Sequence, residues 1–199
     1  MSKKEPVPSL AGYEVLLCVT GGIAGYKAAD LASKLVAAGA GVSAALTDSA
    51  LRFVTDLTFQ TLTGRQVFTN MWQATQTFES QHLSLTERAD LMLVAPATAN
   101  FMAKMAAGIA DDLVSTLALS SHDACPVLVA PAMNTRMWNA PPTRANFARL
   151  KEWGVQFVGP ETGRLACRTI GPGRMSEPAD ILVAATEILL LQPPKAKTK

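Results

Sequence analysis

The chain has few charged residues and no dominant charge. Charged residues make up 17% of 199 residues and the formal net charge is only +2, so the sequence offers no basic face for nucleic acid or for a membrane surface. No apolar run approaches the roughly 20 residues that span a bilayer. Residues 1–12 are a polar leader without the apolar core of a signal peptide. We therefore expect a cytoplasmic protein.

Cysteine and histidine are also scarce. The three cysteines are too widely spaced and odd in number for a disulfide framework. No CxxC, HExxH or His-rich tract occurs, so we expect no metal site. Neither GxGxxG nor GxxxxGKS/T is present, which leaves the dinucleotide fingerprint and the P-loop incomplete.

Hydrophobic residues make up 49% of the chain, which is enough for a sizeable core. Apolar strand-like runs alternate with segments of helical periodicity, and this alternation predicts an α/β fold with a doubly wound parallel sheet of the Rossmann or flavodoxin type. We expect one domain over 13–191, a substrate flap over about 159–175, and a disordered tail over 192–199. The expected strands are 14–20, 41–46, 91–97, 126–132 and 155–158. The expected helices are a short one near Phe53 and those over 26–38, 55–64, 83–90, 97–108, 109–119, 142–153 and 177–191. Residues 65–81 are expected to be loop.

The pentapeptide LVAPA ends two of these strands, at Leu93–Ala97 and Leu128–Ala132. Each strand is expected to stop at its proline, because proline cannot donate to a sheet ladder. Polar segments follow at once and contain Asn100 and Asn134. Because ligands bind at the carboxyl ends of parallel strands, both asparagines are expected on one ligand-binding rim.

The glycine turn Gly21-Gly22-Ile23 stands between the first strand and the first helix. Small residues there let backbone N–H groups approach a phosphate or a carbonyl closely. The same residues also suit a tight turn that binds nothing.

The acidic pair Asp111-Asp112 opens the helix expected over 109–119. Neighbouring residues on a helix face different ways, so helix capping explains this pair better than acid–base chemistry. Lys104 is expected to be a solvated or paired lysine. His82, taken alone, suits a surface or helix-capping position.

The cysteines differ in their surroundings. Cys18 lies in an apolar strand and is expected to be inert core, and Cys125 is expected to be structural. Cys167 stands on a polar loop between Arg164 and Arg168. Positive neighbours favour the thiolate, so Cys167 is the reactive candidate.

Several segments in order resemble the homo-oligomeric flavin-containing cysteine decarboxylases, and within them the phosphopantothenoylcysteine decarboxylase branch. The segments are VTGGIAGYKA, the histidine ahead of the third strand, PATAN, GIADDL, PAMNTRMW and LACxxxGPGRM, within about residues 14–189. PAMNxxMW is the most specific of them.

The resemblance implies bound FMN and conversion of 4′-phosphopantothenoylcysteine to 4′-phosphopantetheine and carbon dioxide, in coenzyme A biosynthesis. It implies His82 as the base, Cys167 as the proton donor and Asn134 as the group that holds the substrate carboxylate. It also implies substrate contacts from Arg136 and from the flap residues Ala166 and Met175. The implied FMN contacts are Gly21, Gly22, Ile23, Thr47, Phe53, Thr98, Ala99, Asn100, Phe101 and Ala132.

Such a reaction needs an electron sink, because a cysteine carboxylate leaves a carbanion that cannot delocalise. FMN supplies that sink by oxidising the thiol carbon, and the protein orients the substrate. A histidine suits the deprotonation of the thiol, and a loop cysteine that closes over the substrate suits the late protonation of carbon.

Two departures from the family pattern keep other functions open. The flap usually reads ACGD but here reads ACRT (Ala166 to Thr169), and Phe101 stands where threonine is usual. A decarboxylase of peptidyl C-terminal cysteine is therefore the first alternative. A non-enzymatic FMN-binding regulatory protein is the second, although its acidic tail is missing here. A flavin prenyltransferase is disfavoured because PAMNxxMW and the cysteine flap are present.

The resemblance also implies an assembly. A trimer, or a dodecamer of trimers, is expected, with FMN at the subunit boundary and apolar helix faces such as FMAKMAAGIA supporting it. No synthetase segment follows in this sequence, so a separate phosphopantothenoylcysteine synthetase is the expected partner besides the small-molecule substrate.

Overall fold

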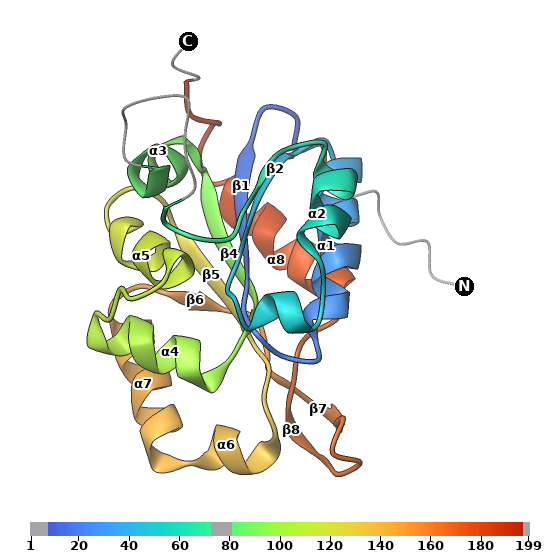
Figure 1. The fold of residues 1–199 in the computed structure, drawn as a ribbon, viewed down its shortest axis with the longest axis vertical. Helices are drawn as coiled ribbons and strands as arrows, with labels where there is room; N and C mark the ends of the chain where they lie inside the picture. Colours follow the sequence, from blue (N-terminus) through green and yellow to red (C-terminus); the bar gives the residue numbers. More distant parts are fainter. Residues whose placement is uncertain (1–7, 73–80, 197–199) are drawn as a thin grey trace.

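A six-stranded parallel sheet, in the order β3-β2-β1-β4-β5-β6, forms the centre of the molecule (Figure 1). The computed structural model describes residues 8–72 and 81–196, and of Gln81 and His82 it describes only the backbone. The strands of this sheet are β1 (Glu14–Val19), β2 (Gly41–Leu46), β3 (Val67–Phe68), β4 (Leu91–Ala97), β5 (Val127–Pro131) and β6 (Gln156–Phe157).

Helices cover both faces of the sheet (Figure 1). The helices are α1 (Gly25–Ala37), the 3₁₀ helix η1 (Ala50–Arg52), α2 (Asp56–Thr63), α3 (Gln81–Arg88), α4 (Ala99–Ala107), α5 (Leu113–Ser120), α6 (Thr135–Asn139), α7 (Pro141–Glu152) and α8 (Pro178–Leu189). Residues of α1, α2 and α8 pack in one apolar cluster, and residues of α3, α4, α5 and α7 pack in the other. The expected doubly wound α/β fold is confirmed. No helix in the described ranges is both long and apolar enough to cross a bilayer.

The strand order places β1 beside β4, with β2 and β5 outside them. The connections therefore run to opposite sides on leaving β1 and β4, and this switch point is where open α/β sheets bind ligands. The two LVAPA copies are neighbours and start in the same register, with Leu93 beside Leu128 and Val94 beside Val129, and the register then shifts so that Ala97 pairs with Pro131. The repeat thus builds two matched strands that end at one rim.

The expectation that each strand stops at its proline is confirmed for β5, which ends at Pro131, and is wrong for β4, which continues through Pro96 to Ala97. The carbonyl oxygen of Pro96 accepts a hydrogen bond from the Thr20 N–H at 3.3 Å. Proline lacks only the donor, so it can stay in a strand where its acceptor is what the neighbour uses.

Other differences lie at short elements. The 65–81 segment contains the two-residue edge strand β3, and its residues 73–80 lie outside the described part of the chain. The helix expected from Ile109 begins at Leu113, because Asp112 caps it. The turn after β5 forms α6, which the sequence analysis does not predict.

The expected flap over 159–175 folds as an antiparallel hairpin of β7 (Glu161–Arg164) and β8 (Ile170–Arg174). Figure 1 shows the hairpin projecting beyond the carboxyl ends of the sheet strands, on the side of α6. The chain therefore does return on itself there, as regular β structure rather than as loop.

The start of the expected disordered tail is ordered by hydrogen bonds. The Lys195 ammonium donates to the carbonyl oxygens of Glu87 and Ala89 at 2.9 and 2.7 Å and of Ala124 at 2.7 Å. The Lys195 N–H donates to the Asp90 carboxylate at 2.8 Å. All three ammonium protons have acceptors, including carbonyls where α3 ends, which explains why this polar segment docks.

Candidate active site

The rim is built by hydrogen bonds between the ends of neighbouring strands. The Thr20 hydroxyl, after β1, donates to the carbonyl oxygen of Pro96 at 2.8 Å and accepts from the Thr98 N–H at 3.0 Å. Thr20 is only 2% exposed. The Ala132 N–H, after β5, donates to the carbonyl oxygen of Ala97 at 2.9 Å. The ends of β1, β4 and β5 are therefore held in one fixed arrangement.

The glycine turn packs tightly against the loop that follows β2. A Cβ on Gly21 would lie 2.3 Å from the Ser49 Cβ and 2.8 Å from the Ser49 carbonyl carbon, so only glycine fits there. A Cβ on Gly22 would lie 3.7 Å from Thr98 Cγ2, which is an ordinary contact. The turn thus brings the backbone after β1 close to both neighbouring loops.

Helix α1 starts at this turn with no compensating group of its own. Its N-terminus has no side-chain cap and its first turn contains no acidic residue. The positive end of a helix and its free N–H groups favour an anion. This turn and helix start therefore suit a phosphate or a polarised carbonyl of a bound cofactor.

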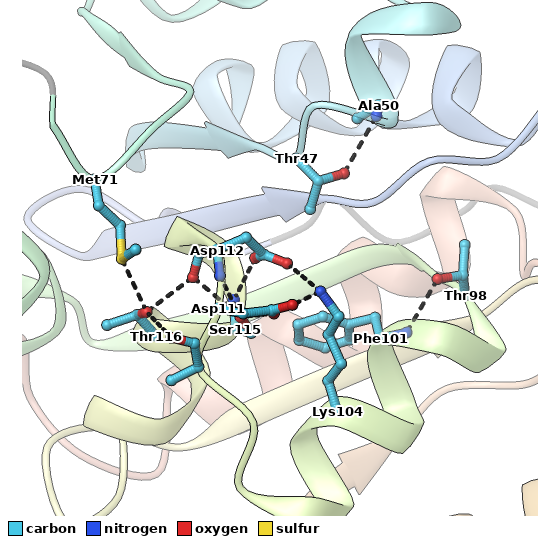
Figure 2. A network of polar contacts seen from close by, with 11 residues as sticks. Thr47, Ala50, Met71, Thr98, Phe101, Lys104, Asp111, Asp112, Ser115 and Thr116 are labelled. Atoms are coloured by element: carbon cyan, nitrogen blue, oxygen red, sulfur yellow. Dashed lines mark hydrogen bonds and ion pairs between the residues drawn. The ribbon is translucent and has the colours of Figure 1, made fainter.

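The loop after β2 contributes Thr47 and Phe53. The Thr47 N–H donates to the carbonyl oxygen of Val19 at 3.1 Å, and its hydroxyl accepts from the Ala50 N–H at 3.2 Å (Figure 2). Phe53 is 49% exposed and lies against the start of α1 near Gly25. Both expected contact residues thus lie beside the glycine turn.

The loop after β4 supplies the start of α4. The Thr98 hydroxyl accepts from the Phe101 N–H at 3.2 Å and so caps the helix (Figure 2). Ala99 is half-buried and Asn100 is exposed at this helix start. The Phe101 side chain, by contrast, is 2% exposed and packs in the core. The Phe101 ring therefore faces the core, and a flavin contact of this residue, which stays a prediction, falls to its backbone.

The loop after β5 ends at Asn134, and Arg136 follows in α6; both residues are exposed. The Asn134 side-chain oxygen accepts from the Met137 N–H at 2.9 Å and caps α6. Its amide N–H groups are left to face a ligand, and they are donors suited to a carboxylate. Among the described residues Arg136 has no carboxylate within ion-pair distance.

The hairpin is docked onto that same loop. The Met133 N–H donates to the carbonyl oxygen of Gly173 at 2.9 Å, and the Thr135 hydroxyl donates to the carbonyl oxygen of Pro172 at 2.9 Å. Gly173 has φ +129°, and a Cβ there would lie 2.2 Å from the Met133 oxygen. The hairpin therefore lies next to Asn134 by a backbone contact that requires glycine.

The base of the hairpin is fixed by ion pairs. Arg174 pairs with Glu161 at 2.7 Å, and Lys27 of α1 pairs with Glu177 at 2.8 Å. The Arg174 guanidinium holds the pKa of the Glu161 carboxyl below its usual range. Met175 is 1% exposed and packs in the core. The Met175 side chain therefore faces the core, and a substrate contact of this residue stays a prediction.

The hairpin tip presents the reactive cysteine. Cys167 is exposed, and a hydrogen bond from the Thr169 side chain lowers the pKa of its thiol. Arg164 and Arg168, the expected cause, do not contribute to this shift. Burial instead raises the pKa of the Cys18 and Cys125 thiols. Cys167 is thus the exposed one of the three cysteines, as the sequence predicts, and its reactivity stays a prediction.

The acidic pair forms a cap rather than a catalytic dyad. Lys104 lies between the two carboxylates, 2.6 Å from Asp111 and 2.7 Å from Asp112 (Figure 2). Asp112 accepts from the Ser115 N–H at 2.8 Å and caps α5. The Lys104 hydrogen bond lowers the pKa of Asp111. The capping and lysine-pairing predictions are confirmed.

Within a single chain, the helix that contains His82 lies away from this rim. His82 belongs to α3, which Figure 1 places at one end of the sheet, with the hairpin at the opposite end. The side chain of His82 lies outside what the structure describes. The rim assembled within a single chain therefore contains the glycine turn, Thr98, Ala132, Asn134 and the hairpin, without α3.

A cavity of about 330 Å³ lies away from the rim and was not predicted. It is bounded by the ends of α4, α5 and α7 and lined by Ile109, Leu119, His122, Cys125 and Trp153, among others. Thr20, Thr135 and Thr169 were also missed by sequence reasoning. Only Thr20 gave a signal, as a polar residue that directly ends an apolar strand.

Fold and rim together define a doubly wound α/β protein with a candidate ligand site at the switch point, next to a hairpin. The chain belongs to the Flavoprotein family, whose sequence profile matches residues 4–190. The coenzyme A biosynthesis bifunctional protein CoaBC of Bacillus subtilis (strain 168) is 46% identical over 171 residues, covering 86% of this chain and 42% of that protein. CoaBC of Vibrio vulnificus (strain YJ016) is 41% identical over 190 residues, covering 96% and 47%. The chain thus spans less than half the length of these relatives.

Solved structures agree with the fold. A mutant PPC decarboxylase, with serine in place of a cysteine and complexed with pantothenoylaminoethenethiol, has a TM-score of 0.79 and 31% identity, covering 87% of this chain and 96% of that chain. The FMN-binding protein AtHal3 has a TM-score of 0.79 and 31% identity, covering 92% and 99%. The FMN-dependent cysteine decarboxylase SpaF has a TM-score of 0.79 and 27% identity, covering 92% and 98%.

Proposed function

We propose that this protein is an FMN-dependent decarboxylase that converts 4′-phosphopantothenoylcysteine to 4′-phosphopantetheine and carbon dioxide in coenzyme A biosynthesis. The observation that carries the proposal is the docking of the hairpin on the loop after β5. The Met133–Gly173 and Thr135–Pro172 hydrogen bonds hold the element that bears Cys167 beside Asn134. These contacts support a site in which Asn134 binds the substrate carboxylate and Cys167 closes over it from the hairpin.

The rim has the features that a flavin nucleotide needs. The glycine turn has no room for a side chain at Gly21, and the uncapped start of α1 favours an anion. Thr47, Thr98 and Ala132 border this turn. Bound there, FMN supplies the reversible two-electron oxidation of the thiol carbon, which creates the electron sink for decarboxylation. FMN-dependent and FMN-binding proteins among the solved relatives support this assignment.

Asn134 and Arg136 hold and orient the anionic end of the substrate. The Asn134 amide donates to the carboxylate while its oxygen stays in the helix cap. An amide is neutral, so it orients the carboxylate without the strong attraction that would resist its loss as carbon dioxide. His82 takes the thiol proton at the start of the reaction.

Cys167 donates the late proton to carbon. Its exposure on a projecting hairpin lets the thiol close over a substrate on the rim and exclude water. The solved PPC decarboxylase with serine in place of a cysteine is complexed with an enethiol. An unsaturated species of this kind is what accumulates when the proton donor is missing, which supports the role given to Cys167.

The site is shared between copies of the chain in a trimer or dodecamer. The separation of α3 from the hairpin supports this arrangement, since a second copy can bring α3 to the rim (Figure 1). Exposed apolar side chains beside the glycine turn also support it: Ile23 (59% exposed), Tyr26 (63%), Phe53 (49%) and Leu57 (65%). The apolar residues Phe101, Met102 and Ala106, by contrast, are buried in the chain's own core.

Two measurements test the proposal. The purified protein is expected to be yellow with an oxidised-flavin spectrum, and to release carbon dioxide from phosphopantothenoylcysteine.

Cys167→Ser is expected to release carbon dioxide without forming saturated product, and His82→Asn is expected to retain FMN without releasing carbon dioxide. A colourless protein that takes up no FMN would contradict the whole proposal.

A second substrate class is favoured by one observation, the flap sequence ACRT. Arg168 and Thr169 change the tip that closes over the substrate, so a peptide ending in cysteine is the alternative. Parallel carbon dioxide assays with phosphopantothenoylcysteine and with a cysteine-ended peptide separate the two. Preferential turnover of the peptide would replace the coenzyme A assignment while keeping the decarboxylase.

A further inference from the structure

The hairpin tip contains a side-chain contact that has no role in the reaction as proposed above. Cys167 Sγ lies 3.1 Å from Thr169 Oγ1. The turn between them is fixed by two backbone hydrogen bonds, from the Leu165 N–H to the Thr169 oxygen and from the Arg168 N–H to the Leu165 oxygen, each 2.9 Å. The thiol and the hydroxyl are therefore held together by the turn itself.

We propose that Thr169 is a positioning residue. Its hydroxyl donates a hydrogen bond to the Cys167 sulfur and stabilises the thiolate that forms when Cys167 gives up its proton. This inference rests on the proposed function for its catalytic part. The contact between sulfur and hydroxyl can be tested without substrate.

The contact favours the thiolate over the thiol. Before proton transfer either the thiol or the hydroxyl can donate, so the hydrogen bond is between neutral groups. After proton transfer the sulfur is a charged acceptor, and hydrogen bonds to charged groups are shorter and stronger. An interaction that strengthens as the charge develops lowers the barrier to the proton transfer.

The electrostatic surroundings agree with this geometry. The pKa of Cys167 is lowered first by the Thr169 hydroxyl and second by the Thr169 backbone N–H. The charged side chains nearest along the tip, Arg164 and Arg168, are exposed and do not contribute to the shift. The Glu161–Arg174 pair at the hairpin base does not contribute either.

The proton transfer balances without a further reactant. The Sγ–H bond of Cys167 breaks and its electron pair stays on sulfur, while the π electron pair of the enethiolate forms the new C–H bond at the substrate carbon that carried the carboxylate. Reduced FMN, where bound, would return its two electrons to the sulfur-bearing carbon. Thr169 keeps its own proton and only shares it with the Cys167 sulfur. The thiolate regains a proton from solvent when the hairpin opens.

A purely structural role for Thr169 makes different predictions. In that case the hydroxyl only satisfies the turn, and its loss changes hairpin order but not the acidity of the thiol. Thr169→Val keeps the β-branched shape and removes the hydroxyl, whereas Thr169→Ser keeps the hydroxyl. Thr169→Asp places a negative charge beside the sulfur, which opposes the thiolate. The three variants separate the hydroxyl from the shape.

The first experiment follows alkylation of Cys167 by iodoacetamide against pH, using mass spectrometry of the peptide that contains it. Only the thiolate reacts, so a raised thiol pKa slows alkylation at neutral pH. Thr169→Val is expected to react about two- to fivefold more slowly than wild type at pH 7, Thr169→Asp more slowly still, and Thr169→Ser at the wild-type rate. Equal rates for wild type and Thr169→Val would overturn the contact.

The second experiment measures product composition with phosphopantothenoylcysteine. In a single turnover Thr169→Val is expected to release carbon dioxide and then to accumulate enethiol, because the protonation of carbon is slowed. In the steady state it is expected to lower kcat for saturated product with KM unchanged, and Thr169→Ser is expected to restore kcat. An unchanged product ratio, together with slower alkylation, would refute the catalytic role. If the wild type releases no carbon dioxide, the proposed function fails, while the alkylation series still decides the contact.

Discussion

Arg168 occupies a backbone conformation that arginine adopts only at a cost. Its φ is +67°, in the left-handed region, where the conformation costs a residue with a Cβ roughly 1–2 kcal/mol. Arg168→Gly is therefore expected to raise the free energy of unfolding by roughly 0.5–1 kcal/mol, once the extra freedom of glycine in the unfolded chain is counted. Urea unfolding monitored by circular dichroism measures this change.

Arg168→Ala is the matched control, because alanine removes the charged side chain and keeps the Cβ. It is expected to give no gain in stability. If alanine stabilises the protein as much as glycine does, the left-handed backbone is not the source of the cost. The flavin-containing cysteine decarboxylases usually have glycine at this position of the flap, so the substitution also restores the usual turn.

The chemistry of single residues was predictable where burial decides it. An apolar strand marks Cys18 as core, and a polar loop marks Cys167 as reactive. Contacts that depend on turn register were not predictable: Arg164 and Arg168 are neighbours of Cys167 in sequence, but Thr169 is its partner in space. The inward orientation of the Phe101 ring was not predicted for a related reason, since it depends on how α4 is rotated about its axis against the core.

The glycine turn can be tested as an element with two substitutions one residue apart. Gly21→Ala places a methyl group 2.3 Å from the Ser49 Cβ and 2.8 Å from its backbone, so the loop after β2 must move. Overpacking of this kind costs roughly 1–3 kcal/mol, and we expect a lower melting temperature and lost flavin absorbance.

Gly22→Ala is the control for that substitution. Its methyl group meets only Thr98 Cγ2 at 3.7 Å, so we expect a stability within about 0.5 kcal/mol of wild type. Differential scanning calorimetry without added FMN measures the melting temperatures of wild type, Gly21→Ala and Gly22→Ala. Equal destabilisation by both alanines would show that general backbone restriction, rather than the Ser49 contact, requires these glycines.

Elements were predictable in proportion to their length and periodicity. The buried strands β1, β2 and β4 gave apolar runs whose ends the structure reproduces within a residue or so. The two-residue strand β3 gave no signal, because two residues carry no period. The hairpin was read as loop since its strands are rich in glycine and polar residues and cover no core face.

At the scale of the whole molecule, the sheet explains why the doubled strand end matters. Leu93 and Leu128 lie in register, so the two loops after them leave the sheet side by side. The first loop starts α4 beside the glycine turn, and the second caps α6 beneath the hairpin. The sequence indicated this rim. It did not indicate that α3 lies at the other end of the sheet, because that depends on tertiary packing.

Separation of α3 from the hairpin leads to a complementation test between two inactive variants. His82→Asn lacks the base and Cys167→Ser lacks the proton donor, so each alone is expected to form no 4′-phosphopantetheine. If each site takes α3 from one copy and the hairpin from another, co-expressed variants rebuild intact sites. Random mixing in a cyclic oligomer gives about one quarter of the sites a histidine and a cysteine together.

Product formed by the mixture, relative to wild type at equal flavin content, is the readout. Mixing either variant with a chain that carries both substitutions is the control, because no intact site can then form. Recovery of about one quarter of the wild-type activity is expected from the first mixture and none from the controls. A mixture as inactive as its controls, from a protein shown to exchange subunits, would place the base and the donor in the same chain and require α3 to move to the rim instead.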